Sequence, residues 1–358
     1  MEVSRTIATL GTTLLLFGFG LGPLLWGPVS EMYGRKWAVL PTYIAGACFS
    51  LGTAMAGNIE TVLLTRFATG FFASAPLNVT GGVLNDLFCT EQRAIALVCY
   101  GIAVLGGPTI EPIQVTALYM FVVASIDILL IDDTMVKKLL VLKAKRLRVE
   151  IKNWALHAQR EEEDINSSSL AHRYLVKPLL LLCTPICLLV SLYASFVYSL
   201  LYANLGAFPV VYQQMRGWNN VIGAIPFLAF LIGIFIGAVM NIANTPRFVR
   251  SFRANGNRPV PEARLPPMMI GSVSFAVSLF VFGWTSQEQI HWVWSCVGAT
   301  FTGFGFFTIF QSALNYLVDT FTEHSASAIA ATTFLRSTFA SAFPLSITPM
   351  LEKMGIPQ

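Results

Sequence analysis

The sequence predicts an all-α integral membrane protein with about ten transmembrane helices arranged in two bundles. It is 55% hydrophobic and only 12% charged over 358 residues, and its mean hydropathy is +0.65. A soluble domain carries roughly 25% charged residues, so this composition indicates a membrane protein. Its apolar runs reach the roughly 20 residues that a spanning helix needs, which is too long for the strands of a barrel.

Ten apolar segments meet this length criterion. They are residues 6–28, 37–57, 61–88, 94–111, 113–131, 179–203, 220–243, 266–285, 292–318 and 325–350. The polar stretch 132–178 divides them into two groups of five. We therefore expect an incomplete N-terminal bundle over 1–131, a cytoplasmic linker over 132–178, and an incomplete C-terminal bundle over 179–358.

A short charged turn at 27–36 orients the whole chain. Its pair Arg35 and Lys36 is expected on the cytoplasmic side, because basic residues in short loops set membrane orientation. The alternate loops then place 18 lysines and arginines inside and three outside, with the remaining two inside spans. This asymmetry predicts a multi-pass protein whose 132–178 linker is cytoplasmic.

The nearly unbroken apolar run 94–131 is the exception to the regular spacing. One helix of 38 residues would be about 57 Å long, nearly twice the thickness of the hydrocarbon core. The charge pattern requires an even number of crossings here. We therefore predict two short helices hinged near Pro108 and Pro112.

The linker is predicted to contain a basic amphipathic helix over 136–158. Apolar residues recur there at near-helical spacing, with lysines and arginines over much of the remainder. Such a helix suits an anionic inner leaflet, although a solvated connector would have the same pattern. Residues 161–169 are acidic and then serine-rich, which predicts a flexible linker. Because the basic residues lie in loops between spans, no nucleic-acid partner is predicted.

Arg66 and Arg336 are the two basic residues inside predicted spans. An arginine near the centre of a spanning helix costs roughly 2.5–3.5 kcal/mol, so it usually faces a cavity or a partner and indicates function. Arg336 lies midway along its span. Arg66 lies five residues into its own, so its side chain could instead reach the outer interface.

Polar and aromatic residues inside the spans are candidates for a substrate cavity. An organic cation or amphiphile would suit this set, although each residue alone fits an interfacial belt or a contact between helices equally well. The candidates are Tyr193, Tyr198, Tyr202, Gln311 and Asn315.

Enzymatic and metal-dependent functions find little support in the sequence. The four histidines are scattered outside the spans, and the six cysteines lie in or beside apolar runs, where free cysteine behaves as a small hydrophobe. No catalytic triad, metal-ligand pair or phosphate-binding loop is evident. We expect no catalytic residues, no metal and no cofactor.

Several motifs resemble those of the major facilitator superfamily, most closely its fungal twelve-helix drug:proton antiporters. Gly27, Glu31, Gly34, Arg35 and Lys36 match the loop motif G-x-x-x-[DE]-x-x-G-R-[RK]. Further similar stretches follow in the family's order. They are Arg66–Gly70, the antiporter motif beginning Gly106, Gly107, Pro108, the loop Asn257–Leu265, and the helix segments Asn315–Asp319 and Phe334–Ser337.

The resemblance implies a two-bundle transporter that exchanges protons for small organic or cationic compounds, such as drugs or polyamines, by alternating access. In that reading the 27–36 motif locks one conformation, with Glu31 and Arg35 as its charges. Arg66, Gly70 and Arg336 belong to the proton-coupling site and cavity, and the proton gradient is the energy source. The partners would be the lipid bilayer, the substrate and protons, and the location would be the plasma membrane.

The same resemblance leaves two other functions open. The ten segments look like the second to eleventh helices of the family, so the first and last helices and part of the fifth-to-sixth junction are expected to be missing. A truncated, non-transporting membrane protein with a regulatory or interaction role is therefore one alternative. A facilitator without proton coupling is the other.

Overall fold

The computed structural model describes residues 5–88, 90–110, 136–158, 161, 176–219, 222–256, 258–287, 289–321 and 325–354. These ranges are helical apart from short turns, which confirms the predicted fold class. Nine of the ten predicted spans coincide with long helices in the described part of the chain. The span 113–131 and the hinge residue Pro112 lie outside it.

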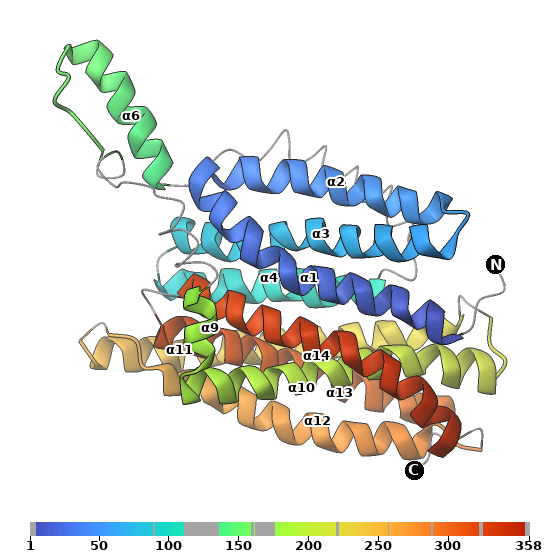
Figure 1. Cartoon of the computed structure of the whole chain (residues 1–358). Coiled ribbons are helices and arrows are strands. Elements are labelled where there is room, and N and C mark those ends of the chain that lie inside the picture. The colour runs from blue at the N-terminus through green and yellow to red at the C-terminus, as the bar shows by residue number, and fades with distance from the viewer. Residues whose placement is uncertain are drawn as a thin grey trace.

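In the described part of the chain, the N-terminal half contains α1 (Arg5–Tyr33), α2 (Arg35–Met55), α3 (Ile59–Leu87) and α4 (Thr90–Ile110), which are labelled in Figure 1. The packing of α1 on α3 depends on small residues. A Cβ atom at Gly70 would lie 2.0 Å from the carbonyl oxygen of Leu15, and one at Gly18 would lie 2.4 Å from that of Phe67. Only glycine allows the two backbones to approach this closely.

The charged stretch 27–36 is mostly helical, so the predicted turn is much shorter than this stretch and reverses the chain at Gly34. Helix α1 continues to Tyr33 and α2 begins at Arg35, which leaves Gly34 alone outside a helix. Gly34 has φ 101° and ψ 161°, a region open almost only to glycine. Hydropathy detects the apolar part of a helix and misses its polar last turns, which is why the predicted span ended at residue 28.

Helix α6 (Val136–Ile151) confirms a basic helix in the linker, but it is shorter than predicted. The chain leaves the helix at Lys152, whose φ of 55° lies in the left-handed region. An ion pair between Arg148 and Glu161 joins the helix to the segment after it. Figure 1 shows α6 standing apart from the bundle.

The C-terminal half contains the long helices α10 (Pro185–Pro209), α11 (Ile225–Ala254), α12 (Leu265–Thr285), α13 (Trp292–Thr320) and α14 (Ser325–Met354). Short helices connect or extend them: α9 (Lys177–Leu182), the π-helix η3 (Val210–Met215), and the 3₁₀ helices η4 (Ile222–Ala224) and η5 (Pro261–Arg264). The predicted span 179–203 is broken between α9 and α10, where Pro185 occupies the first turn of α10.

Helix α13 is the most buried helix of this half and packs between α11 and α12. Glycines again allow the contact: a Cβ atom at Gly303 would lie 2.2 Å from the carbonyl oxygen of Phe230 on α11. Helices α11 and α13 extend to Ala254 and Thr320, so residues 244–254 and 319–320 are helical, although they follow the predicted spans.

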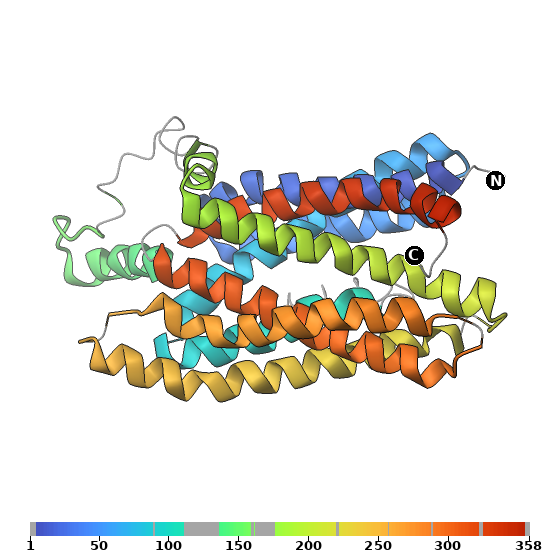
Figure 2. The same ribbon diagram turned by 90° about the horizontal axis from the view of Figure 1, so that it is seen from below.

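Among the described helices, the two halves meet mainly along α1 with α14 and α4 with α11, and to a smaller extent along α3 with α14 and α4 with α13. In Figure 2, α14 (red) lies beside α1 (blue) and α10 (yellow-green). One apolar core crosses this boundary, since Leu16, Val98 and Leu105 pack in the same cluster as residues of α10 to α14. The division of the chain into two bundles and a linker, with boundaries at residues 131 and 178, stays a prediction.

Connections at the two ends of the bundle alternate as the charge pattern requires. The helix ends that face each other in the pairs α1–α2, α3–α4, α11–α12 and α13–α14 lie at the same end of the bundle as α6. The first turn of α1 and the last turn of α14 lie at the other end (Figures 1 and 2). Six described helical stretches are long and apolar enough to cross a membrane: Thr9–Gly27, Arg35–Met55, Pro185–Gln213, Ile222–Ala254, Pro261–Thr285 and Trp292–Thr320.

Candidate functional site

A small cavity lies between the two halves of the molecule. Helices α3 and α4 line it from one half, and α13 and α14 from the other. Counted as the space open to the centre of a water molecule, its volume is about 50 Å³, which is room for a few waters. The lining residues that matter for chemistry are Tyr100, Gly101, Gln311, Asn315, Thr333 and Arg336.

Arg336 is the charged group of this cavity, and its residue is only 3% exposed. Its guanidinium carbon lies 4.7 Å from the ring centroid of Tyr198 and 4.8 Å from that of Phe310. Its Nε has no hydrogen-bond partner among the described residues, and no ion pair joins it to any of them. Aromatic faces therefore hold this cation.

Two amides from α13 supply neutral polar groups beside Arg336. Gln311 and Asn315 are one helical turn apart, so they share a face, and they are 2% and 6% exposed. A Cβ atom at Gly101 would lie 2.5 Å from the Oε1 of Gln311. Glycine at 101 therefore lets α4 reach the amide on α13.

The predicted tyrosines divide into two places. Tyr198 contacts Arg336, and its hydroxyl lies 3.4 Å from that of Tyr202, but neither tyrosine is among the residues that line the cavity. The hydroxyl of Tyr193 shares a hydrogen bond of 2.6 Å with Ser272 on α12. Tyr193 does not line the cavity.

Arg66 and Gly70 lie on α3 where it packs against α1, and neither lines the cavity that contains Arg336. The Arg66 side chain is half-buried and runs over Gly11, where a Cβ atom would come within 3.2 Å of the arginine Cδ. Gly70 is one turn further along and meets the backbone of Leu15. Their role in proton coupling stays a prediction.

The predicted conformational lock is built around a buried serine. Arg35 Nη1 donates to the Oγ of Ser30 at 3.1 Å, and that hydroxyl donates to the carbonyl oxygen of Gly27 at 2.9 Å. Gly34 is buried and Lys36 is half-buried. The side chain of Glu31 lies outside the described part of the structure, so its pairing stays a prediction.

The antiporter motif lies on α4 at the boundary with α11. A Cβ atom at Gly106 would lie 3.1 Å from Cδ1 of Leu231, whereas one at Gly107 would meet no atom within 4 Å. The side chain of Pro108 is outside the described part. Gly106 is thus the member of the motif that faces the other half.

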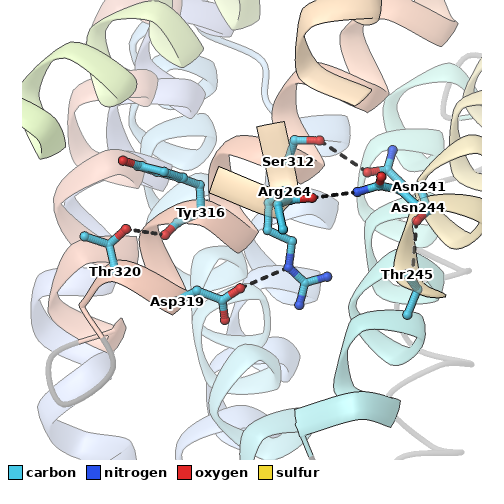
Figure 3. Close-up of polar contacts among 9 residues, drawn as sticks. Asn241, Asn244, Thr245, Arg264, Ser312, Tyr316, Asp319 and Thr320 are labelled. Carbon is cyan, nitrogen blue, oxygen red and sulfur yellow. Dashed lines mark hydrogen bonds and ion pairs between the residues drawn. The ribbon is translucent and has the colours of Figure 1, made fainter. Parts of the chain in front are cut away.

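A second polar cluster lies at the α6 end of the C-terminal half, and Figure 3 shows its members. Arg264 Nε donates to Asp319 Oδ2 at 3.0 Å, and both residues are buried. The guanidinium carbon of Arg264 also lies 3.4 Å from the ring centroid of Phe248. Asn244 donates to the carbonyl oxygen of Ala263 at 2.9 Å, which positions the backbone just before Arg264.

Sequence reasoning missed the role of several of these residues. Arg264 and Asp319 stand inside motifs that resemble the family, but their pairing across 55 positions leaves no local signal. Tyr100 donates to the carbonyl oxygen of Leu77 at 2.5 Å and lines the cavity, yet a tyrosine in an apolar helix is common. Phe310 could not be distinguished from other core aromatics.

Within the described residues, no group of three histidine, cysteine or acidic side chains could hold a metal ion. The expectation that the protein needs neither a metal nor a cofactor stays a prediction.

A family model described as Major Facilitator Superfamily matches residues 1–344. This match confirms the family membership that the sequence motifs indicate.

Individual relatives cover nearly the whole chain. The efflux pump bik6 of Gibberella fujikuroi is 47% identical over 99% of this chain and 77% of its own length. The multidrug transporter FLU1 of Candida albicans is 34% identical over 99% of this chain and 62% of its own length. The crystal structure of the human organic anion transporter MFSD10 has a TM-score of 0.65 at 14% identity, covering 100% of this chain and 82% of that one, which shows a shared fold.

Proposed function

Because the chain belongs to the major facilitator superfamily, we propose that it exports small organic compounds in exchange for protons by alternating access between its halves. Like its relatives, it is a multi-pass membrane transporter and not an enzyme. We propose three further points beyond transport itself: that protons are exchanged, that the substrates are small organic compounds, and that they move out of the cell. We also propose the plasma membrane as its location, with residues 132–178 in the cytoplasm.

The observation that carries the proposal is the cavity shared by both halves. Its walls come from α3 and α4 on one side and from α13 and α14 on the other. A site at the boundary of two bundles becomes accessible from either side of the membrane when the bundles rock against each other. Its polar groups, Gln311, Asn315 and Arg336, are available to recognise a substrate.

Efflux from cells that lack their own export pumps tests this function. Cells expressing the full chain are loaded with rhodamine 6G, a fluorescent cation, or with fluorescein, a fluorescent anion. We expect at least one dye to leave faster than from empty-vector cells, and an uncoupler to abolish the difference. Export that survives the uncoupler would favour the facilitator. Equal retention of both dyes would contradict transport and favour a regulatory role.

Arg66 tests the coupling step. We expect Arg66→Ala to lower uncoupler-sensitive efflux at least tenfold, because a cation held within the spanning region biases a nearby proton site. The exposed Arg250 at the end of α11 gives the matched control Arg250→Ala, which should keep the wild-type rate. Unchanged proton-dependent efflux in Arg66→Ala would remove Arg66 from the mechanism.

A further inference from the structure

We propose that the cavity between the halves binds organic acids, with Arg336 as the residue that receives the acidic group. The inference rests on the proposed transport function and narrows its substrate class. It disfavours the cationic drugs and polyamines that the family resemblance suggests.

No acidic side chain in the described part of the chain neutralises the charge of Arg336. The rings of Tyr198 and Phe310 contact the guanidinium, and no described acid pairs with it. None of the described residues that line the cavity is acidic. A buried cation without a counter-ion is costly in a low-dielectric interior, so a bound anion is stabilised there and a bound cation is repelled.

The donors of Arg336 suit a carboxylate or a phenolate. Two aromatic rings contact the face of the guanidinium group. Its Nε has no hydrogen-bond acceptor among the described residues. A guanidinium presents its N–H donors in a planar fork that matches two carboxylate oxygens. An acid entering the cavity would supply the acceptor that Nε lacks.

The remaining lining selects the body of the ligand. Leu77, Leu97, Val104, Leu314 and Val318 make most of the wall apolar. Gln311 and Asn315 add amides that can bind a carbonyl or hydroxyl group. The predicted ligand is therefore a flat or compact apolar compound with one acidic group. Since the cavity now has room for only a few waters, binding requires the halves to separate.

Three naphthalene derivatives that differ mainly in charge test the substrate class by binding alone. Tritiated 1-naphthoate, 1-naphthamide and 1-naphthylmethylammonium are offered to the purified full chain in a scintillation proximity assay. We expect the acid to bind roughly tenfold to a hundredfold more tightly than the amide, the range for a hydrogen bond to a charged group. The ammonium compound should bind most weakly. Equal affinities, or tightest binding of the cation, would overturn the proposal.

Variants then test the residue. Arg336→Gln should remove the preference for the acid, while Arg250→Gln, at an exposed arginine, should keep it. A preference that persists in a monodisperse Arg336→Gln protein would overturn the assignment to Arg336.

Photolabelling of the wild-type chain covers the case in which Arg336→Gln does not fold. The small acid 4-azidobenzoate should label peptides of α4, α13 and α14, and 1-naphthoate should compete while 1-naphthamide should not. Labelling confined to helices other than α3, α4, α13 and α14 would contradict the site. Because both assays measure binding, an acid-selective cavity in a chain without efflux would refute the transport function and leave this inference standing.

Discussion

The two buried arginines of the C-terminal half have different electrostatic partners. Arg264 donates to Asp319, so removing either residue leaves the other as a buried charge. Arg336 has aromatic contacts and no acidic partner among the described residues. Substitutions at Arg264 should therefore act on stability, and substitutions at Arg336 should act on binding.

Asp319→Asn tests the first of these roles. Breaking a buried ion pair by removing one partner costs about 3–5 kcal/mol, so we expect a clearly lower Tm in detergent. The control is Glu262→Gln. Glu262 is an exposed acid on η5, the same short helix that carries Arg264, so this variant should leave Tm almost unchanged. The double variant Arg264→Gln/Asp319→Asn should recover part of the loss. Equal Tm values for Asp319→Asn and the wild type would refute a stabilising pair.

The junction between α1 and α2 depends on the backbone conformation of Gly34. Any side chain at φ 101° and ψ 161° is strained by about 1–3 kcal/mol, so Gly34→Ala should lower Tm. Gly57→Ala, in the connection at the other end of α2 where a Cβ meets no atom within 4 Å, is the matched control. If both variants melt alike, the α1–α2 junction does not depend on glycine.

At the scale of single elements, α6 differs from the other long helices because it lies outside the bundle (Figure 1). It carries exposed leucines at 139, 140 and 142 beside exposed Lys143, Lys145 and Arg146. Apolar and basic side chains together favour the headgroup region of an anionic bilayer, at about 1 kcal/mol per basic residue near the surface.

Hydrogen exchange in nanodiscs tests whether α6 lies on lipid. Amides of 139–151 in the full chain should exchange more slowly in discs with phosphatidylserine than in discs of phosphatidylcholine alone. Lys143→Gln/Lys145→Gln/Arg146→Gln should remove the difference, and Lys143→Arg/Lys145→Arg should keep it. Identical exchange in both lipids would support the solvated connector instead.

At the scale of the whole molecule, the sequence was sufficient for the helices and their alternating direction, because spans of about 20 apolar residues have few other structures available. Helix ends were not predictable from hydropathy. Polar last turns such as Ser30 to Tyr33 remain helical, and single residues such as Gly34 and Pro185 set the breaks.

The candidate site was partly predictable for the same reason. Arg336, Gln311 and Asn315 stand out because polar groups are costly in apolar helices, and the structure places all three in one cavity. The contributions of Tyr100 and Phe310, and the pairing of Arg264 with Asp319, depend on which helices become neighbours. That information is spread over the whole sequence.

The contact between the halves gives a final prediction about transport. At Gly20 on α1, a Cβ atom would lie 2.7 Å from the Cβ of Ser337 on α14, across the boundary that alternating access must open and close. Gly20→Val should therefore reduce efflux at least tenfold, while a small separation of the halves relieves the clash and preserves folding.

Two other glycines separate this effect from simple destabilisation. Gly206→Val, at an exposed position of α10 where a Cβ meets no atom within 4 Å, should transport normally. Gly303→Val forces a side chain against the backbone of Phe230 within one half, so it should lower the yield of folded protein. Efflux by Gly20→Val at the wild-type rate would show that close contact of α1 with α14 is not needed for the transport cycle. Equal loss of folded protein in Gly20→Val and Gly303→Val would make the α1–α14 contact a requirement for folding.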